Sequence, residues 1–174
     1  MNVISRPFLK KGVFFIDLLF FTAFFYNRNM AETLGMLCDK LTIVKLKQYH
    51  SEDAQRLESL AKQEKSLQQE IDELVARALA GDIPVEKLSF AANKVFKKEG
   101  NDVREITGTI GAVFSQLADV NCQLWHEQEK VYDFGQVPAE EKDSVVKQLA
   151  ILNLERNKCI DEIDRQLVNM IKAR

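Results

Sequence analysis

Seven apolar residues in the second half of the chain are spaced alternately three and four positions apart, and this spacing constrains the fold more than any other feature. They are Val103, Ile106, Ile110, Val113, Leu117, Val120 and Leu124. On an α-helix the spacing forms one continuous apolar stripe, which must be buried against other helices. The pattern predicts a long helix from about Val103 to Asp133.

Four other segments carry helical patterns, and no segment alternates as a β-strand does. The expected helices cover about 32–50, 53–80, 85–99 and 138–172. The second should stop at Gly81, which is followed by Asp82-Ile83-Pro84. We therefore expect an all-α fold, an antiparallel bundle of four to five long helices with coiled-coil-like packing.

Two glycines fall inside the predicted helix 103–133, at Gly108 and Gly111, beside the apolar stripe. Each glycine weakens a helix by about 1 kcal/mol relative to alanine. We expect that they allow a neighbouring backbone to approach closely.

The composition limits the possible functions. The chain has 174 residues, 46% of them apolar, and a net charge of -2, which argues against a sequence-independent nucleic-acid binder. Cys38, Cys122 and Cys159 are isolated and form no C-x-x-C pair. We expect reduced core thiols in a cytoplasmic protein, without a disulfide framework or a zinc site.

The first 29 residues differ from the rest, so we expect two parts, 1–29 and a helical domain at 30–174. Residues 12–26 are almost wholly apolar but contain Asp17, and the 29 residues carry a net charge of +3. Three interpretations stay open: a membrane anchor or signal sequence, an apolar helix packed on the bundle, and a true translation start at Met30. The apolar run is shorter than the roughly 20 residues that span a bilayer. Association with a membrane is expected only if residues 1–29 belong to the natural protein.

Three polar clusters are candidates for chemistry. In the first, His50 could be a ligand or general base beside Tyr49, or it could simply end a helix. In the second, His126 and Glu129 could bind a metal or relay a proton, while Trp125 could anchor packing. Neither histidine has the glutamate three residues earlier that a di-iron bundle site requires, so we expect no metal and no cofactor.

The third cluster lies on the last predicted helix and contains Asn153, Arg156 and Asn157. A buried arginine needs a carboxylate partner, which Asp39 or Glu129 could supply. Such a polar layer could fix the register of the helices, or it could line a pocket for a phosphate-sugar ligand. The candidate pocket residues are Asp39, Tyr49, His50, Asn121, Trp125, His126, Glu129, Asn153, Arg156 and Asn157.

These clusters also carry a resemblance to a bacterial family of unknown function. The segment Asp39-Lys40-Leu41-Thr42-Ile43, ending in Tyr49-His50, resembles the family's opening signature. Asn121-x-x-Leu124-Trp125-His126 and Asn153-x-x-Arg156-Asn157 are similar to its later patterns, from residue 31 to the end of the chain. The family's acidic pair after Trp-His is spread here to Glu127 and Glu129, which weakens a two-carboxylate mechanism.

The resemblance implies an all-helical bacterial protein, often encoded near glycosyltransferases of envelope polysaccharide synthesis, with no established activity. Two functions follow as hypotheses. The first is a helical interaction or accessory module that forms a homo-oligomer or binds a protein partner. The second is an enzyme or a binding protein with a polar pocket, for which a sugar or nucleotide sugar is the expected ligand.

Overall fold

The computed structural model describes residues 31–90 and 103–174, and this part of the chain contains four α-helices and no strand. The helices are α2 (Leu34–Tyr49), α3 (Ala54–Ala80), α4 (Ile110–Tyr132) and α5 (Lys142–Lys172). The predicted all-α bundle is therefore confirmed. Contacts divide the chain after Ala31, and the bundle belongs to the unit Glu32–Arg174. The apolar run 12–26 lies outside the described residues.

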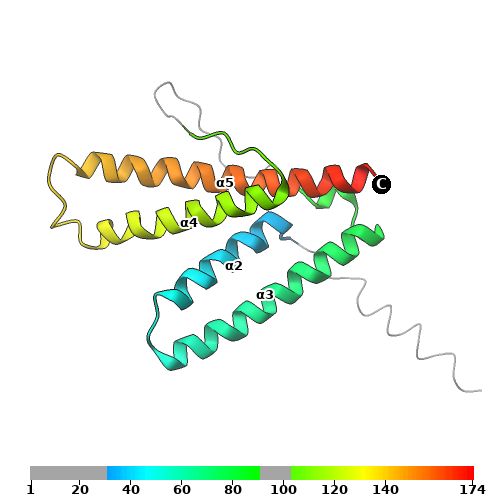
Figure 1. The fold of residues 1–174 in the computed structure, drawn as a ribbon, viewed down its shortest axis with the longest axis horizontal. Coiled ribbons are helices and arrows are strands. Elements are labelled where there is room, and N and C mark those ends of the chain that lie inside the picture. The colour runs from blue at the N-terminus through cyan, green and yellow to red at the C-terminus, as the bar shows by residue number, and fades with distance from the viewer. Residues whose placement is uncertain (1–30, 91–102) are drawn as a thin grey trace, which may run out of the picture. The chain divides into compact units, whose positions relative to one another are not determined.

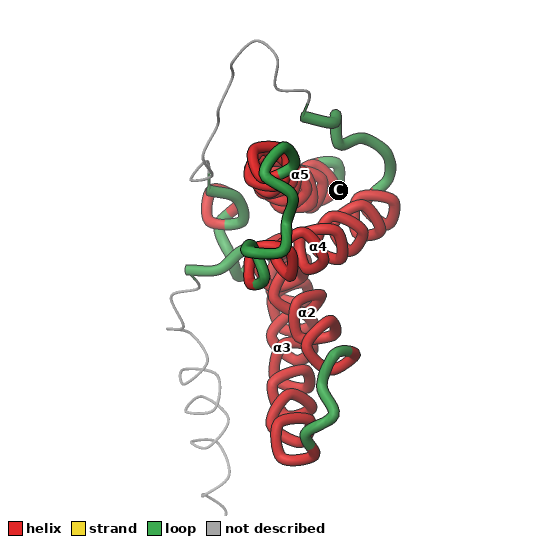
Figure 2. The backbone as a smooth tube through the Cα atoms, turned by 90° about the vertical axis from the view of Figure 1, so that its left-hand side faces the viewer, coloured by secondary structure: helices red, strands yellow, loops and turns green. Residues whose placement is uncertain are grey.

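The bundle consists of two helical hairpins, α2–α3 and α4–α5 (Figure 1). Helix α2 is the central element, because it packs against α3, α4 and α5. Figure 2 shows the same arrangement from a view turned by 90°, with α2 and α3 on one side and α4 and α5 on the other. The buried apolar core includes Leu37, Val44, Leu67, Leu74, Val113, Leu117, Val120, Leu152, Ile163 and Leu167.

Local sequence signals set the ends of α2 and α3. The Thr33 hydroxyl caps α2 by accepting a hydrogen bond from the Met36 backbone N–H at 3.3 Å. Asp53 caps α3 in the same way, through the Arg56 N–H at 2.6 Å. Gly81 ends α3 in the left-handed conformation, with φ of 82°.

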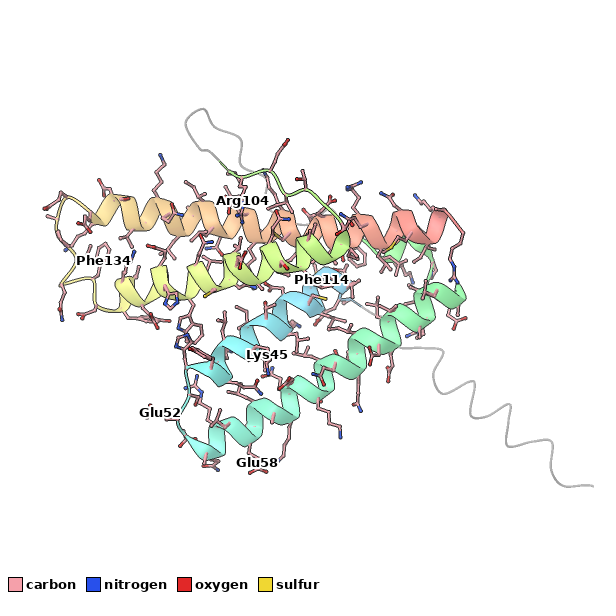
Figure 3. All side chains as sticks on the ribbon, viewed as in Figure 1. Lys45, Glu52, Glu58, Arg104, Phe114 and Phe134 are labelled. Atoms are coloured by element: carbon pink, nitrogen blue, oxygen red, sulfur yellow. The ribbon has the colours of Figure 1, made fainter. Side chains whose placement is uncertain are left out.

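Two of the predicted helices need correction. Helix α4 starts at Ile110 rather than near Val103, because Gly108 has φ of 117°, which a helix does not allow, and Thr109 then caps the helix. The segment before it runs beside α5, where the Arg104 N–H donates to Glu155 Oε1 at 3.0 Å (Figure 3). Of the predicted helix 85–99, the structure contains only the 3-10 turn η1 (Val85–Lys87); residues 91–102 lie outside the described part.

The close approach of two backbones occurs at Gly35, not at the glycines that the sequence suggested. A Cβ atom on Gly35 would lie 2.4 Å from the Ile160 carbonyl oxygen, so α2 and α5 are in backbone contact there. A Cβ on Gly111 would meet nothing within 4 Å, and Gly108 precedes the helix. A residue without a Cβ atom is therefore needed at Gly35 of α2. The expectation that Gly108 and Gly111 allow the close approach was wrong.

Candidate functional site

The ten candidate residues do not gather at one point. Asp39, Asn121 and Arg156 form one group with Thr42, which we call the buried polar cluster. Tyr49, His50, Trp125, His126 and Glu129 form a second group, which we call the surface aromatic cluster. Asp39 and His50 are eleven positions apart on α2. That corresponds to roughly 16 Å along the helix axis, too far for one shared small-molecule pocket.

Asn153 and Asn157 belong to neither group. The Asn153 side chain is exposed and donates to the Leu149 carbonyl oxygen of its own helix at 2.9 Å. Asn157 is half-buried on α5. The structure thus gives no contact that links these two amides to the other candidates.

The buried polar cluster joins three helices. Asp39 on α2 is 5% exposed, and its carboxylate accepts two hydrogen bonds from Arg156 on α5, through Nε at 2.7 Å and through Nη2. Asn121 on α4 donates through Nδ2 to Asp39 Oδ1 at 2.9 Å and to Thr42 Oγ1 at 2.6 Å. The pair with Asp39 raises the pKa of Arg156. These bonds join α2, α4 and α5 and so fix their register, although the buried Asn121 Oδ1 has no hydrogen-bond partner in the described residues.

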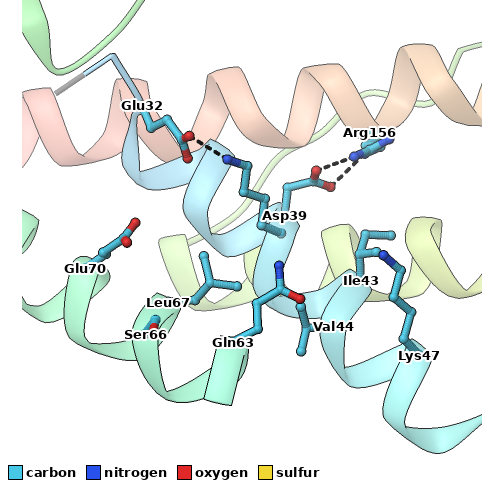
Figure 4. Close-up of a pocket in the computed structure, with 11 residues that line it drawn as sticks. Glu32, Asp39, Ile43, Val44, Lys47, Gln63, Ser66, Leu67, Glu70 and Arg156 are labelled. Atoms are coloured by element: carbon cyan, nitrogen blue, oxygen red, sulfur yellow. Dashed lines mark hydrogen bonds and ion pairs between the residues drawn. The ribbon is translucent and has the colours of Figure 1, made fainter. Parts of the chain in front are cut away.

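An open groove of about 430 Å³ runs between α2 and α3, and Figure 4 shows its lining side chains. Asp39 and Arg156 are the only members of the ten candidates that line it. Two of its three cations are already paired with carboxylates, Arg156 with Asp39 and Lys40 with Glu32. Most of the positive charge in the groove is therefore neutralised within the protein, and little remains to hold an anionic ligand.

The surface aromatic cluster forms where α2 ends beside α4. The His50 ring is stacked on Trp125, with centroids 4.8 Å apart and an angle of 12° between the rings. His126 meets His50 edge-on at 5.9 Å, and Tyr49 does the same at 5.1 Å. The Trp125 Nε1–H donates to Glu129 Oε1 at 2.8 Å, and His126 Nδ1 lies 3.3 Å from Oε2. The hydrogen bonds from His126 and Trp125 lower the pKa of Glu129.

The described residues contain no group of three or more histidine, cysteine, aspartate or glutamate side chains that could together hold a metal ion. The three thiols are free, and two of them, Cys38 and Cys159, are buried. Burial raises the pKa of the Cys38 thiol to about 12 and that of the Cys159 thiol to about 11. Both thiols are therefore neutral at physiological pH and unsuited to nucleophilic chemistry.

Sequence reasoning did not single out the contact between Asp164 and the start of α2. Asp164 on α5 is 2% exposed, and its Oδ1 accepts from the Gly35 N–H at 2.7 Å. The Thr33 side chain also hydrogen-bonds this carboxylate. The signal was present in the pattern, since Asp164 interrupts the apolar stripe of the last helix between Ile163 and Leu167.

Burial raises the pKa of Asp164 to about 6, although the hydrogen bonds from Thr33 and Gly35 favour its charged form. The folded protein therefore holds a proton between about pH 4 and 6 that the unfolded chain releases, so this group's contribution to stability falls as pH rises through that window. We expect Asp164→Asn to be more stable than wild type at pH 7.5, by up to about 3 kcal/mol, and by no more than about 1 kcal/mol at pH 4.5. Thermal unfolding of both proteins at the two pH values measures this, and an equal difference at both would contradict it.

Comparison with models of protein families, with curated proteins and with solved structures gave no match for this chain. A search of residues 31–90 and 103–174 found no helix with the length and apolar character needed to cross a membrane. The described residues form an all-helical bundle in which α2 lies between α3 and the longer α4–α5 hairpin.

Proposed function

We propose that this protein is a helical interaction module that pairs with a second copy of itself. The proposed contact surface is the part of the α4–α5 hairpin that extends beyond the end of α2. We call it the distal hairpin, and it comprises His126–Tyr132 of α4 and Lys142–Asn153 of α5. Its α4 part meets α2 only at its start, where the ring of His126 contacts that of His50, the residue that ends α2.

The observation that supports this proposal is an apolar face that no helix of residues 31–90 and 103–174 covers. Helix α4 continues for seven residues after Trp125, about 10 Å, and Tyr132 at its end is 81% exposed. On α5, Leu149 lies seven positions before Arg156, on the side of the helix that faces α2, and is half-buried against Val120, Leu124 and Leu152 of its own hairpin. Val146, one turn earlier, is 56% exposed.

A second copy fits this surface because two hairpins make a four-helix bundle. An amphipathic helix pair buries its apolar side only when another layer covers it. Most soluble oligomers are symmetric pairs in which the same patch meets itself, and four-helix packing is a common way to close such a patch. Two distal hairpins related by a twofold axis would satisfy both conditions.

The test is the oligomeric state of the full chain across concentration. We expect wild type to show a concentration-dependent dimer by sedimentation velocity, because the distal hairpins bury Val146 between them. Val146→Glu should shift the protein to monomer, since it places a charge in that contact. Met170→Glu is the matched control, because Met170 is also an exposed apolar residue of α5, 46% exposed, but lies at the opposite end of the helix.

A strictly monomeric wild type at 100 μM would overturn self-association, and so would equal behaviour of the two variants. The alternative, an enzyme or a binding protein for a sugar or nucleotide sugar, has less support, because the polar candidates are separated and the groove's cations are mostly paired. An accessory role in envelope polysaccharide synthesis rests on the family resemblance and stays a prediction, as does a cytoplasmic location.

A further inference from the structure

We propose that His50 and His126 form a binding site for a divalent transition-metal ion such as Ni²⁺, Cu²⁺ or Zn²⁺. These are the two histidines of the chain, and they are 76 positions apart in sequence. The end of α2 and the last turns of α4 bring them together in the surface aromatic cluster. His126 and Glu129 lie at the start of the distal hairpin, but the site uses neither Val146 nor Tyr132 and does not depend on self-association.

The spacing of the two rings fits a shared ion. A metal bound to an imidazole nitrogen at about 2.0–2.1 Å lies roughly 3.2 Å from the ring centroid. Two imidazoles on one ion therefore have centroids roughly 5.2 Å apart at the tetrahedral angle and up to about 6.4 Å apart when they lie on opposite sides. The observed separation of 5.9 Å falls within this range.

The second feature is the carboxylate behind His126. Glu129 Oε2 lies 3.3 Å from His126 Nδ1, so Nδ1 carries the proton and Nε2 keeps its lone pair for a metal. The Trp125 Nε1–H holds the other oxygen of Glu129 in place. A carboxylate on the outer nitrogen of a ligating histidine is the usual support of such ligands, because it fixes the tautomer and the ring orientation.

The third feature is His50. Its backbone N–H caps α2, whereas its ring nitrogens make no hydrogen bond to any residue in the described part of the chain. Stacking on Trp125 fixes the plane of the ring. Both imidazoles thus offer a free nitrogen in a fixed ring, and imidazole ligands suit Zn²⁺, Ni²⁺ and Cu²⁺. Water would complete the coordination, since no third protein ligand joins them in the described residues.

The chain contains a reporter for this site, because Trp125 is its one tryptophan and is stacked on His50. We would titrate the full-length protein with NiCl₂ at pH 7.5 and follow tryptophan fluorescence, with calorimetry for the stoichiometry. We expect saturable quenching with one ion per chain. His50→Gln and His126→Gln should each weaken binding at least tenfold. Glu129→Gln should weaken it about tenfold, because the carboxylate that fixes the tautomer of His126 is lost.

Cys122→Ser is the matched control, because Cys122 is a half-buried thiol four positions before His126 on the same helix. It should bind Ni²⁺ as wild type does. A second measurement does not need the variants: the ring-proton signals of the two histidines should broaden together in the NMR spectrum of wild type when Ni²⁺ is added. No saturable quenching up to 1 mM Ni²⁺, quenching unchanged in both histidine variants, or quenching abolished by Cys122→Ser would overturn the proposal.

Discussion

Replacing Arg156 by methionine is expected to lower the free energy of unfolding by about 3 kcal/mol, one of the two largest destabilising effects that we predict for a single substitution. The reason is the position of its partner. Asp39 is buried, and in the variant its carboxylate keeps only the hydrogen bond from Asn121 at 2.9 Å. An uncompensated buried charge is costly, whereas the methionine retains much of the packing of the arginine stem. Urea unfolding followed by circular dichroism measures the change.

Arg165→Met is the matched control for this prediction. Arg165 lies on the same helix and also makes two hydrogen bonds to a carboxylate, that of Glu162, but its side chain is 61% exposed. Ion pairs of this kind contribute little, so we expect almost no change. The double variant Asp39→Asn with Arg156→Met should be less destabilised than the sum of the two single variants. Equal losses in Arg156→Met and Arg165→Met would contradict the role of the buried polar cluster.

Replacing Gly35 by alanine is expected to destabilise the fold by about 2–3 kcal/mol. The added methyl group would lie 2.4 Å from the Ile160 carbonyl oxygen, and a backbone atom cannot move aside as a flexible side chain can. Helices α2 and α5 would have to separate, which also stretches the hydrogen bond from the Gly35 N–H to Asp164. For a protein of this size we expect a decrease of roughly 5–10 °C in Tm.

Gly111→Ala is the control for Gly35→Ala, because it makes the same chemical change within a helix where a Cβ atom meets nothing within 4 Å. Alanine favours the helix, so this variant should gain about 0.4–1 kcal/mol. If calorimetry shows that Gly35→Ala lowers stability and Gly111→Ala raises it, the assignment of the close approach to α2 and α5 is supported. A neutral Gly35→Ala would show that the two helices are less tightly packed than the structure indicates.

The sequence predicted the helices whose signals are local. The predicted ranges 32–50 and 53–80 agree closely with α2 and α3, because Asp53 and Gly81 cap and stop a helix through their own side chain or backbone. The start of α4 could not be predicted in this way. Val103 and Ile106 continue the apolar spacing, but they lie in a segment that runs beside α5 and is fixed by Glu155 and Gln166.

The candidate site was also predicted only in part. The sequence indicated correctly that Arg156 needs a carboxylate partner, since a buried charge must be compensated. It left that partner open between Asp39 and Glu129, and only the packing of α2 against α5 selects Asp39. Glu129 instead accepts from Trp125 on its own helix.

By itself the sequence determined an all-helical bundle, because apolar periodicity and capping depend on residues within a few positions of one another. Only the tertiary structure decided that eight of the ten polar candidates form two separate clusters, that Gly35 rather than Gly108 or Gly111 carries the close approach, and that no helix of the described residues covers the distal hairpin. These properties depend on distances between residues far apart in the chain, such as the 5.9 Å between the rings of His50 and His126. Spacing along one helix defines which side of it is buried, but not which partner covers that side.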